Sequence, residues 1–138
     1  MFFQHCNAPK VLKQMKWLNK MFVLEADPSL EAGTYRLRLN GDHPVYAAHF
    51  PGHPITPGVC IVGLAAELTA LQAARPLRLK GVENLKFLRP LDPREQAEIC
   101  VEIALSEQPG GDVSARGRIW WEDTTFSKFS IVLAPDEV

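Results

Sequence analysis

The sequence predicts an α+β protein in which a curved antiparallel sheet wraps around one long buried helix. Three observations lead to this prediction: a composition typical of one globular domain, a single segment that is apolar on nearly every side, and several segments that alternate apolar and polar residues. The 138 residues are 46% hydrophobic and 22% charged, which is enough for a real core. We expect one domain over residues 1–138, with residues 1–20 as a candidate peripheral extension.

Charge and cysteine content argue against several classes of protein. A formal net charge of −1 gives no overall basic field for nucleic acid or an anionic membrane. Three widely spaced cysteines, Cys6, Cys60 and Cys100, argue against a disulfide framework, and no CxxC pair indicates zinc. The longest apolar run, residues 59–66, is too short to span a membrane, and the N-terminus does not resemble a signal peptide. We expect a cytoplasmic protein that binds no nucleic acid, membrane or metal.

The long helix is predicted for residues 58–74, which read GVCIVGLAAELTALQAA. Apolar side chains on nearly every side are typical of a buried helix. At about 1.5 Å per residue it is about 25 Å long, which is the width of a small domain. Thr56 is the expected N-cap and Pro57 suits the first helical position, while Arg75-Pro76 ends the helix.

Strands are predicted on both sides of this helix. Residues 17–24 are read as a strand, or as a short helix leading into one, because periodicity does not separate the two. Residues 34–39 alternate polar and apolar side chains and end at an Asn-Gly-Asp turn. Four further strands are expected at residues 77–87, 97–105, 113–121 and 125–133. A mostly antiparallel sheet that covers one apolar helix curls around it, and its open edges favour pairing between two copies.

One stretch, residues 49–67, has the features of a site and reads HFPGHPITPGVCIVGLAAE. A histidine beside a turn is followed directly by the N-terminus of the long helix. Imidazole titrates at about pH 6.5, so a neutral histidine can accept a proton near pH 7. The free N–H groups of a first helical turn suit a developing negative charge, and Gly58 lets a substrate approach the backbone closely.

This stretch and the predicted architecture together resemble the hot-dog-fold beta-hydroxyacyl-ACP dehydratases of fatty-acid synthesis (FabA/FabZ-like), where ACP is acyl carrier protein. The motif is His-Phe-Pro-Gly, with a Pro-Gly pair that begins five residues after that glycine. KFLRPL at residues 86–91 and EQAEI at residues 95–99 look like the family's strand, Arg-Pro turn and next strand. The resemblance covers roughly residues 22–133 and implies the hot-dog fold.

The resemblance also implies a reaction and a set of partners. The expected reaction is dehydration of a 3-hydroxyacyl-ACP thioester to a trans-2-enoyl-ACP, in fatty-acid or polyene-type lipid synthesis. No cofactor is expected, because the substrate is carried on the phosphopantetheine of ACP. The expected partners are ACP and further copies of the chain, in a homodimer or a trimer of dimers, with each active site at a subunit interface.

Specific residues match the family's motif. His49 matches the catalytic base that removes the C2 proton, and Gly58 matches the glycine whose backbone N–H polarises the thioester carbonyl. Ile55 matches the residue whose carbonyl holds the histidine ring. The other expected substrate-binding residues are Phe50, Pro51, Gly52, Pro57, Val59 and Gly63.

The chain departs from the family at one position. The family's carboxylate lies fourteen positions after the histidine, where this chain has Gly63. The nearest candidate for the general acid is Glu67, one turn further along the same helix face, beside a space at Gly63 for a water molecule or part of the substrate. A structural carboxylate or an interface ion pair is an equally good interpretation of Glu67. Gly63 leaves two alternative functions open: a non-catalytic acyl-ACP-binding subunit or heterodimer partner, and a hot-dog thioesterase.

Overall fold

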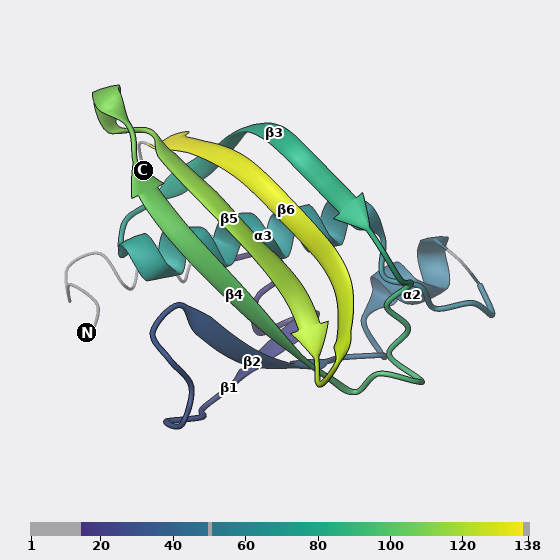
Figure 1. Cartoon of the computed structure of the whole chain (residues 1–138). Coiled ribbons are helices and arrows are strands. Elements are labelled where there is room, and N and C mark those ends of the chain that lie inside the picture. Colours follow the sequence, from purple (N-terminus) through teal and green to yellow (C-terminus); the bar gives the residue numbers. More distant parts are fainter. Residues whose placement is uncertain (1–14, 50, 137–138) are drawn as a thin grey trace.

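The computed structural model of the chain describes residues 15–49 and 51–136. In order, the elements are β1 (Phe22–Glu25), β2 (Thr34–Leu39), α2 (Pro44–His49), α3 (Gly58–Ala73), β3 (Leu77–Phe87), β4 (Glu98–Glu107), the 3₁₀ turn η1 (Pro109–Gly111), β5 (Val113–Trp121) and β6 (Thr124–Pro135). Within these residues the strands form one antiparallel sheet in the order β1-β2-β4-β5-β6-β3. The sheet curves around α3 (Figure 1), so the predicted α+β arrangement is confirmed.

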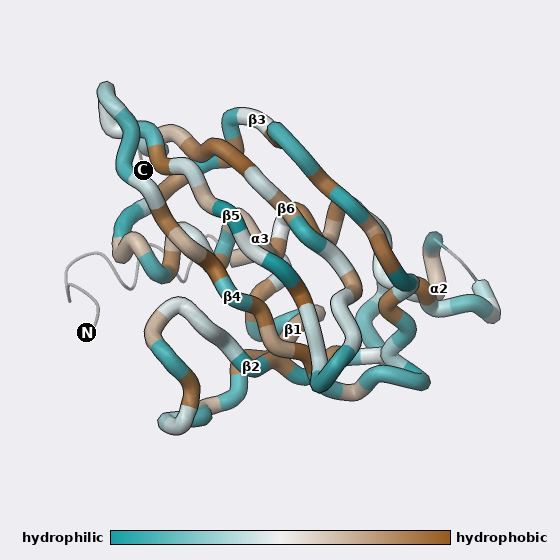
Figure 2. The backbone as a smooth tube through the Cα atoms, in the orientation of Figure 1, coloured by the Kyte–Doolittle hydropathy of each residue, from teal (hydrophilic) through white to brown (hydrophobic). Residues whose placement is uncertain are grey.

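The strands turn one row of side chains toward the helix. On β4, Ile99, Val101 and Ile103 are 0%, 0% and 5% exposed, whereas the alternate residues Glu98 and Glu102 lie on the outer face. This period of two is the one expected for a sheet with one face on a core. Figure 2 shows hydrophobic and hydrophilic segments in turn along the strands.

One side of α3 packs on the concave face of the sheet. Eight of its side chains are buried, and Leu64 and Leu68 at their centre are 0% exposed. They belong to the same core as Val101 of β4 and Ile131 of β6. The opposite side is only partly covered, and Val59 there is 66% exposed. The single chain therefore buries less of the helix than the sequence predicts, because the sheet reaches it from one side.

β3 is an edge strand with one open side. It pairs with β6, and the register shifts between Leu79 and Gly81, which marks a β-bulge. Leu79, Val82 and Phe87 are 40%, 45% and 53% exposed. An edge that offers unpaired backbone groups and apolar side chains is suited to pairing with another strand.

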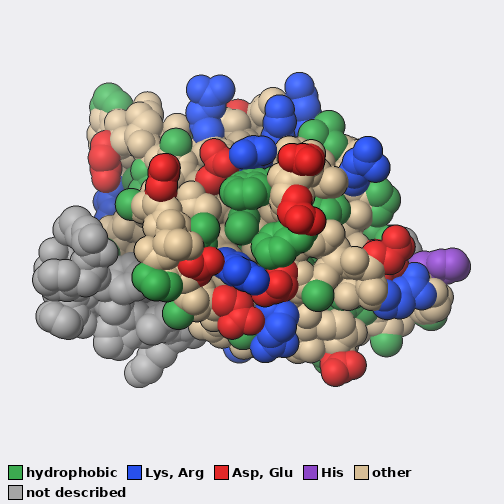
Figure 3. Space-filling view, turned by 60° about the horizontal axis from the view of Figure 1, so that its bottom comes forward, with side chains coloured by type: hydrophobic (Ala, Val, Ile, Leu, Met, Phe, Trp, Pro, Cys, Tyr) green, Lys and Arg blue, Asp and Glu red, His purple; other side chains and the backbone are tan. Residues whose placement is uncertain are grey.

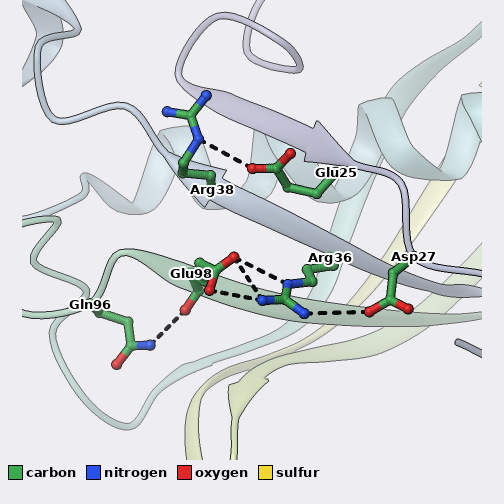
Figure 4. A network of polar contacts seen from close by, with 6 residues as sticks. All are labelled: Glu25, Asp27, Arg36, Arg38, Gln96 and Glu98. Carbon is green, nitrogen blue, oxygen red and sulfur yellow. Dashed lines mark hydrogen bonds and ion pairs between the residues drawn. The ribbon is translucent and has the colours of Figure 1, made fainter. Parts of the chain in front are cut away.

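Ion pairs join the N-terminal strands to the rest of the sheet. Arg36 on β2 lies 2.9 Å from Glu98 on β4 and 3.5 Å from Asp27, which follows β1. Arg38 lies 3.2 Å from Glu25 on β1, and both sets of contacts are drawn in Figure 4. Figure 3 shows a face of the molecule on which hydrophobic side chains are surrounded by basic and acidic ones. Partly exposed pairs each stabilise little, so we expect the apolar core to dominate stability.

Replacing Leu68 by alanine tests this expectation. The side chain is completely buried between α3 and the sheet, so its loss should lower the free energy of unfolding by about 2–5 kcal/mol. Urea denaturation at a fixed protein concentration measures the change. Lys128→Ala, on the exposed side of β6, is the control and should stay within about 0.5 kcal/mol. Similar losses for the two variants would contradict the assignment of the core.

Candidate active site

His49 is the last residue of α2, a short helix that the sequence pattern did not predict. Pro44 begins the helix, and a proline in the first turn is a known start signal. The His49 side chain is exposed in the single chain. Figure 1 shows α2 beside the end of α3 at which β3 also finishes.

Buried hydrogen bonds hold the loop between α2 and α3. Thr56 donates from its backbone N–H and from its hydroxyl to the Leu91 carbonyl, at 2.8 Å in both cases. The Tyr46 hydroxyl lies 2.9 Å from the Thr56 hydroxyl, and it is the donor there because the Thr56 proton is already used. Burial raises the pKa of Tyr46 to about 12, so the phenol keeps its proton. The prediction that Thr56 is the helix N-cap was wrong: Pro57 holds that position.

The turn that follows β3 supports the same loop. Asp92 accepts hydrogen bonds from the backbone N–H and the guanidinium of Arg94, each at 2.8 Å. Arg94 also donates to the carbonyl of Gly52 in the loop, at 3.5 Å. The hydrogen bonds from Arg94 hold the pKa of Asp92 below its ordinary value. Residues 51–57 are thus tied to residues 91–94 at both ends of the loop.

A pocket of about 340 Å³ lies at the N-terminus of α3. It is lined by Ile55, Thr56, Pro57, Gly58, Ile61, Phe87, Leu88, Arg89, Pro90 and Leu91. The structure thus brings three of the expected site residues, Ile55, Pro57 and Gly58, into one wall. Because most of the lining is apolar, the pocket suits an apolar chain with one polar group at the helix end.

The N-terminus of α3 offers backbone donors to this pocket. Among the residues that the structure describes, no side chain caps the helix, and Pro57 at the N-cap is extended. The first amide that bonds back to Pro57 is that of Cys60, so the earlier N–H groups lack a partner within the helix. The Phe87 ring closes over Gly58, where a Cβ would lie 2.7 Å from its Cζ. A side chain at residue 58 would displace the Phe87 ring, so glycine suits this packing. The helix dipole adds to the attraction for negative charge.

Gly63 and Glu67 lie outside the pocket lining and contact the N-terminal segment. The Trp17 indole fills the space beside Gly63, its Nε1 2.2 Å from the place of a Cβ, so the predicted space for water or substrate is absent in the single chain. The Glu67 carboxylate accepts hydrogen bonds from the backbone N–H groups of Lys16, Trp17 and Leu18, at 2.6, 2.9 and 2.7 Å. An ionised acceptor fits these donors best, which favours the structural interpretation of Glu67 over the general acid.

The remaining expected residues are not gathered at the pocket. Pro51 and Gly52 are exposed in the loop, and Val59 is exposed on the outer side of α3. Phe50 lies outside the described residues. No sequence pattern predicted that Trp17 lies beside Gly63 or that the Leu91 carbonyl binds Thr56. Both are contacts between distant parts of the chain.

The cysteines behave as buried apolar residues. Cys60 and Cys100 are free thiols, 1% and 5% exposed, and burial raises the pKa of both; Cys6 is not among the described residues. In residues 15–49 and 51–136 no group of three His, Cys, Asp or Glu side chains is placed to hold a metal ion. No helix in the same part of the chain is long and apolar enough to cross a membrane.

The hydroxyl network can be tested by replacing Thr56 with valine, which keeps the shape of the side chain. The buried Tyr46 hydroxyl then loses its acceptor, so the free energy of unfolding should fall by about 1–3 kcal/mol. Urea denaturation measures the loss. Adding Tyr46→Phe removes the orphaned hydroxyl and should recover part of the stability, and a double variant that is as unstable as the sum of the single ones would contradict the network.

Asp92 should contribute to acid sensitivity. Its folded pKa lies below the unfolded value of about 3.9, so its contribution to stability is present above that pH and is lost as the pH falls through the folded pKa. Asp92→Asn should therefore be less stable at neutral pH and should lose part of the pH dependence below about pH 4. Chemical denaturation across this range measures both. Asp123→Asn, in the exposed β5–β6 turn, is the control and should keep the full dependence.

Comparison with known proteins finds dehydratases among the relatives of this chain. The dehydratase FabZ of Myxococcus xanthus, a 3-hydroxyacyl-[acyl-carrier-protein] dehydratase, is 29% identical over 107 residues, which are 71% of this chain and 63% of that protein. FabZ of Haemophilus influenzae (strain PittEE) is 34% identical over 70 residues, 45% of this chain and 47% of the relative. The chain thus spans about half to two thirds of the length of these curated relatives.

A solved structure and a family model extend the comparison. The dehydratase heterocomplex ApeI:P from Xenorhabdus doucetiae has a TM-score of 0.60 and 21% identity, with 82% of this chain and 97% of that chain covered. This likeness shows the fold, and the predicted hot-dog fold is confirmed. The family model described as ApeI dehydratase matches residues 26–114, which are more than half of the 138 residues. The chain therefore belongs to the ApeI-like family of FabA/FabZ-like hot-dog dehydratases.

Proposed function

We propose that the protein dehydrates a 3-hydroxyacyl thioester carried on ACP and releases a trans-2-enoyl thioester, in fatty-acid or polyene-type lipid synthesis. The observation that carries the proposal is the N-terminus of α3, which presents Gly58 without a side-chain cap in an apolar pocket. The preceding helix, α2, ends at His49. Membership of the ApeI-like family supports the same reaction.

The proposed roles follow the charges that develop during the reaction. His49 takes the C2 proton as general base. Negative charge then moves to the thioester oxygen, where the Gly58 N–H and the positive end of α3 stabilise it. The C3–O bond breaks, the hydroxyl leaves as water with a proton from an acid, and the C2=C3 double bond forms. This chemistry needs only proton transfer, which is why we propose that no cofactor is involved.

The source of the acid separates two candidate functions. Glu67 is held by three backbone N–H groups and Gly63 is covered by Trp17, so neither position of this chain is a ready proton donor. We propose that the acid comes from a partner subunit, as in a heterodimer with a homologue that carries a carboxylate at the position of Gly63. In the second candidate function, the chain is a non-catalytic acyl-ACP-binding subunit of such a pair.

Assembly through the open edge would complete the site. β3 leaves one side unpaired, and Leu79, Val82 and Val59 expose apolar surface on β3 and α3. We propose that a second subunit covers this surface, either a copy of the chain in a homodimer or trimer of dimers, or a homologue. ACP is the proposed donor of the substrate, and the cytoplasm is the proposed location.

An assay with 3-hydroxyacyl-ACP tests the proposal. Mass spectrometry of the product should show the enoyl thioester, and His49→Ala should lower its rate by about 10²- to 10⁴-fold. His53→Ala, which removes the exposed histidine of the loop that follows α2, is the matched control and should stay within about twofold.

The products and the subunit requirement separate the alternatives. If enoyl product forms only after a carboxylate-bearing homologue is added, the heterodimer is supported. The rate of that pair with His49→Ala then decides the role of this chain: a lower rate makes it the catalytic subunit, and an unchanged rate makes it the binding subunit. Free fatty acid instead of an enoyl thioester indicates a thioesterase. Absence of any product, with and without the homologue, would reject the dehydratase.

A further inference from the structure

The Glu67 carboxylate on α3 binds the backbone of the segment before β1. Glu67, near the middle of α3, accepts hydrogen bonds from three consecutive backbone N–H groups, those of Lys16, Trp17 and Leu18. Charge-assisted bonds from consecutive amides are strong and define the path of the backbone. Leu18 is 2% exposed, so this short segment is part of the packed structure.

The anchored backbone places the Trp17 indole directly against Gly63. A Cβ at residue 63 would lie 2.2 Å from the indole Nε1 and 2.3 Å from its Cδ1. Side-chain carbons do not approach so closely, so the indole and any side chain at 63 exclude each other. Glycine is unfavourable inside a helix, and here the close approach of Trp17 is a reason for its presence.

The Trp17 ring also lies near the residue that precedes α2. The ring of His43 lies 6.1 Å from the Trp17 ring at an angle of 50°. The His43 Nδ1 accepts a hydrogen bond from the backbone N–H of Val45, at 3.2 Å, and therefore serves the first turn of α2 as a capping side chain does. The backbone next to His43 is tied to the same segment, because the Asn40 N–H bonds to the Met21 carbonyl at 2.9 Å.

α2 depends on such outside contacts for its orientation. It has six residues, of which only Tyr46 is buried, and a helix of this length is not stable by itself. Tyr46 anchors its middle through Thr56, while its N-terminal end is bounded by His43 and Trp17. The end of this helix is His49.

We propose that Trp17 is a positioning residue for His49, because its indole sits as a wedge between Gly63 of α3 and His43 at the start of α2. The wedge sets the distance between the two helices and so the place of the imidazole relative to the N-terminus of α3. Gly63 supplies the space for the wedge, and Glu67 holds the backbone that carries it. The expected effect of Trp17 on catalysis rests on the proposed function. The expected effect of Trp17 on the position of α2 does not depend on that function.

A cycle of two substitutions tests the wedge in the full chain, with its partner subunit present if activity requires one. Gly63→Ala adds one methyl group that collides with the indole, and it should lower kcat by about 10- to 100-fold with little change in KM, because a base misplaced by about 1 Å loses rate rather than binding. Trp17→Ala should lower kcat to a similar extent, and Trp17→Phe should recover part of it.

The decisive variant combines both changes. In the Trp17→Ala background, Gly63→Ala should leave kcat unchanged and raise the melting temperature, because the collision is gone and alanine favours the helix. Equal losses of kcat from Gly63→Ala in both backgrounds, or full activity of Trp17→Ala, would overturn the proposal.

Amide hydrogen exchange provides a readout that does not need activity. The N–H groups of Val45 and Tyr46 are bonded to His43, and their exchange should be faster by about tenfold or more in Trp17→Ala, while amides of β5 stay protected. If the unmodified protein yields no enoyl product, the proposed function fails but this exchange still decides the wedge. Unchanged exchange of these α2 amides in Trp17→Ala would reject the wedge. Because this measurement needs only the Trp17→Ala variant, it also decides the question if Gly63→Ala does not fold.

Discussion

The burial of α3 is the constraint on which the rest of the structure depends. The helix is apolar on nearly every side, and a sheet that is continuous from β1 to β3 covers one side of it. The sheet curves because a flat sheet would contact α3 along one line only. Leu64 and Leu68 would then lack neighbours on either side of the helix. The other side of α3 and the open edge of β3 keep apolar residues at the surface, and this is the surface that we propose a second subunit covers.

The proposed site lies where the helix leaves this core. Its loop is held by groups that belong to the turn after β3: the Leu91 carbonyl, which receives two bonds from Thr56, and the Asp92–Arg94 pair. A loop tied to a rigid scaffold places the Gly58 N–H with little freedom to move, which is the condition for stabilising charge without reorganisation. Tyr46 extends the same support to α2 and its histidine.

Two glycines of α3 are explained by aromatic rings from other elements. Phe87 at the end of β3 closes over Gly58, and Trp17 from the N-terminal segment closes over Gly63. The first contact shapes the pocket at the helix N-terminus. The second fills the position at which the resemblance to the dehydratases predicts a carboxylate, and it leaves no room for a side chain at residue 63. Glu67, which the helix offers one turn later, is used to hold Trp17 in place.

Local patterns determined most of the fold. Alternation with a period of two predicted the strands, and continuous apolar character predicted α3 to within one residue of its observed end. The motif from His49 to Gly58 indicated a candidate site. These features could be predicted because each depends on residues that are neighbours in the chain.

Tertiary contacts decided the rest. They determined that α2 forms, that Thr56 bonds to Leu91 instead of capping α3, that Gly63 is filled, and that Glu67 binds backbone amides about fifty residues away in the sequence. None of these contacts has a local pattern, because the partner of each group is selected only when the curved sheet brings distant segments against the helix. The sequence by itself thus determined the helix, the strands and the candidate base and oxyanion donor, and only the folded chain decided what surrounds them.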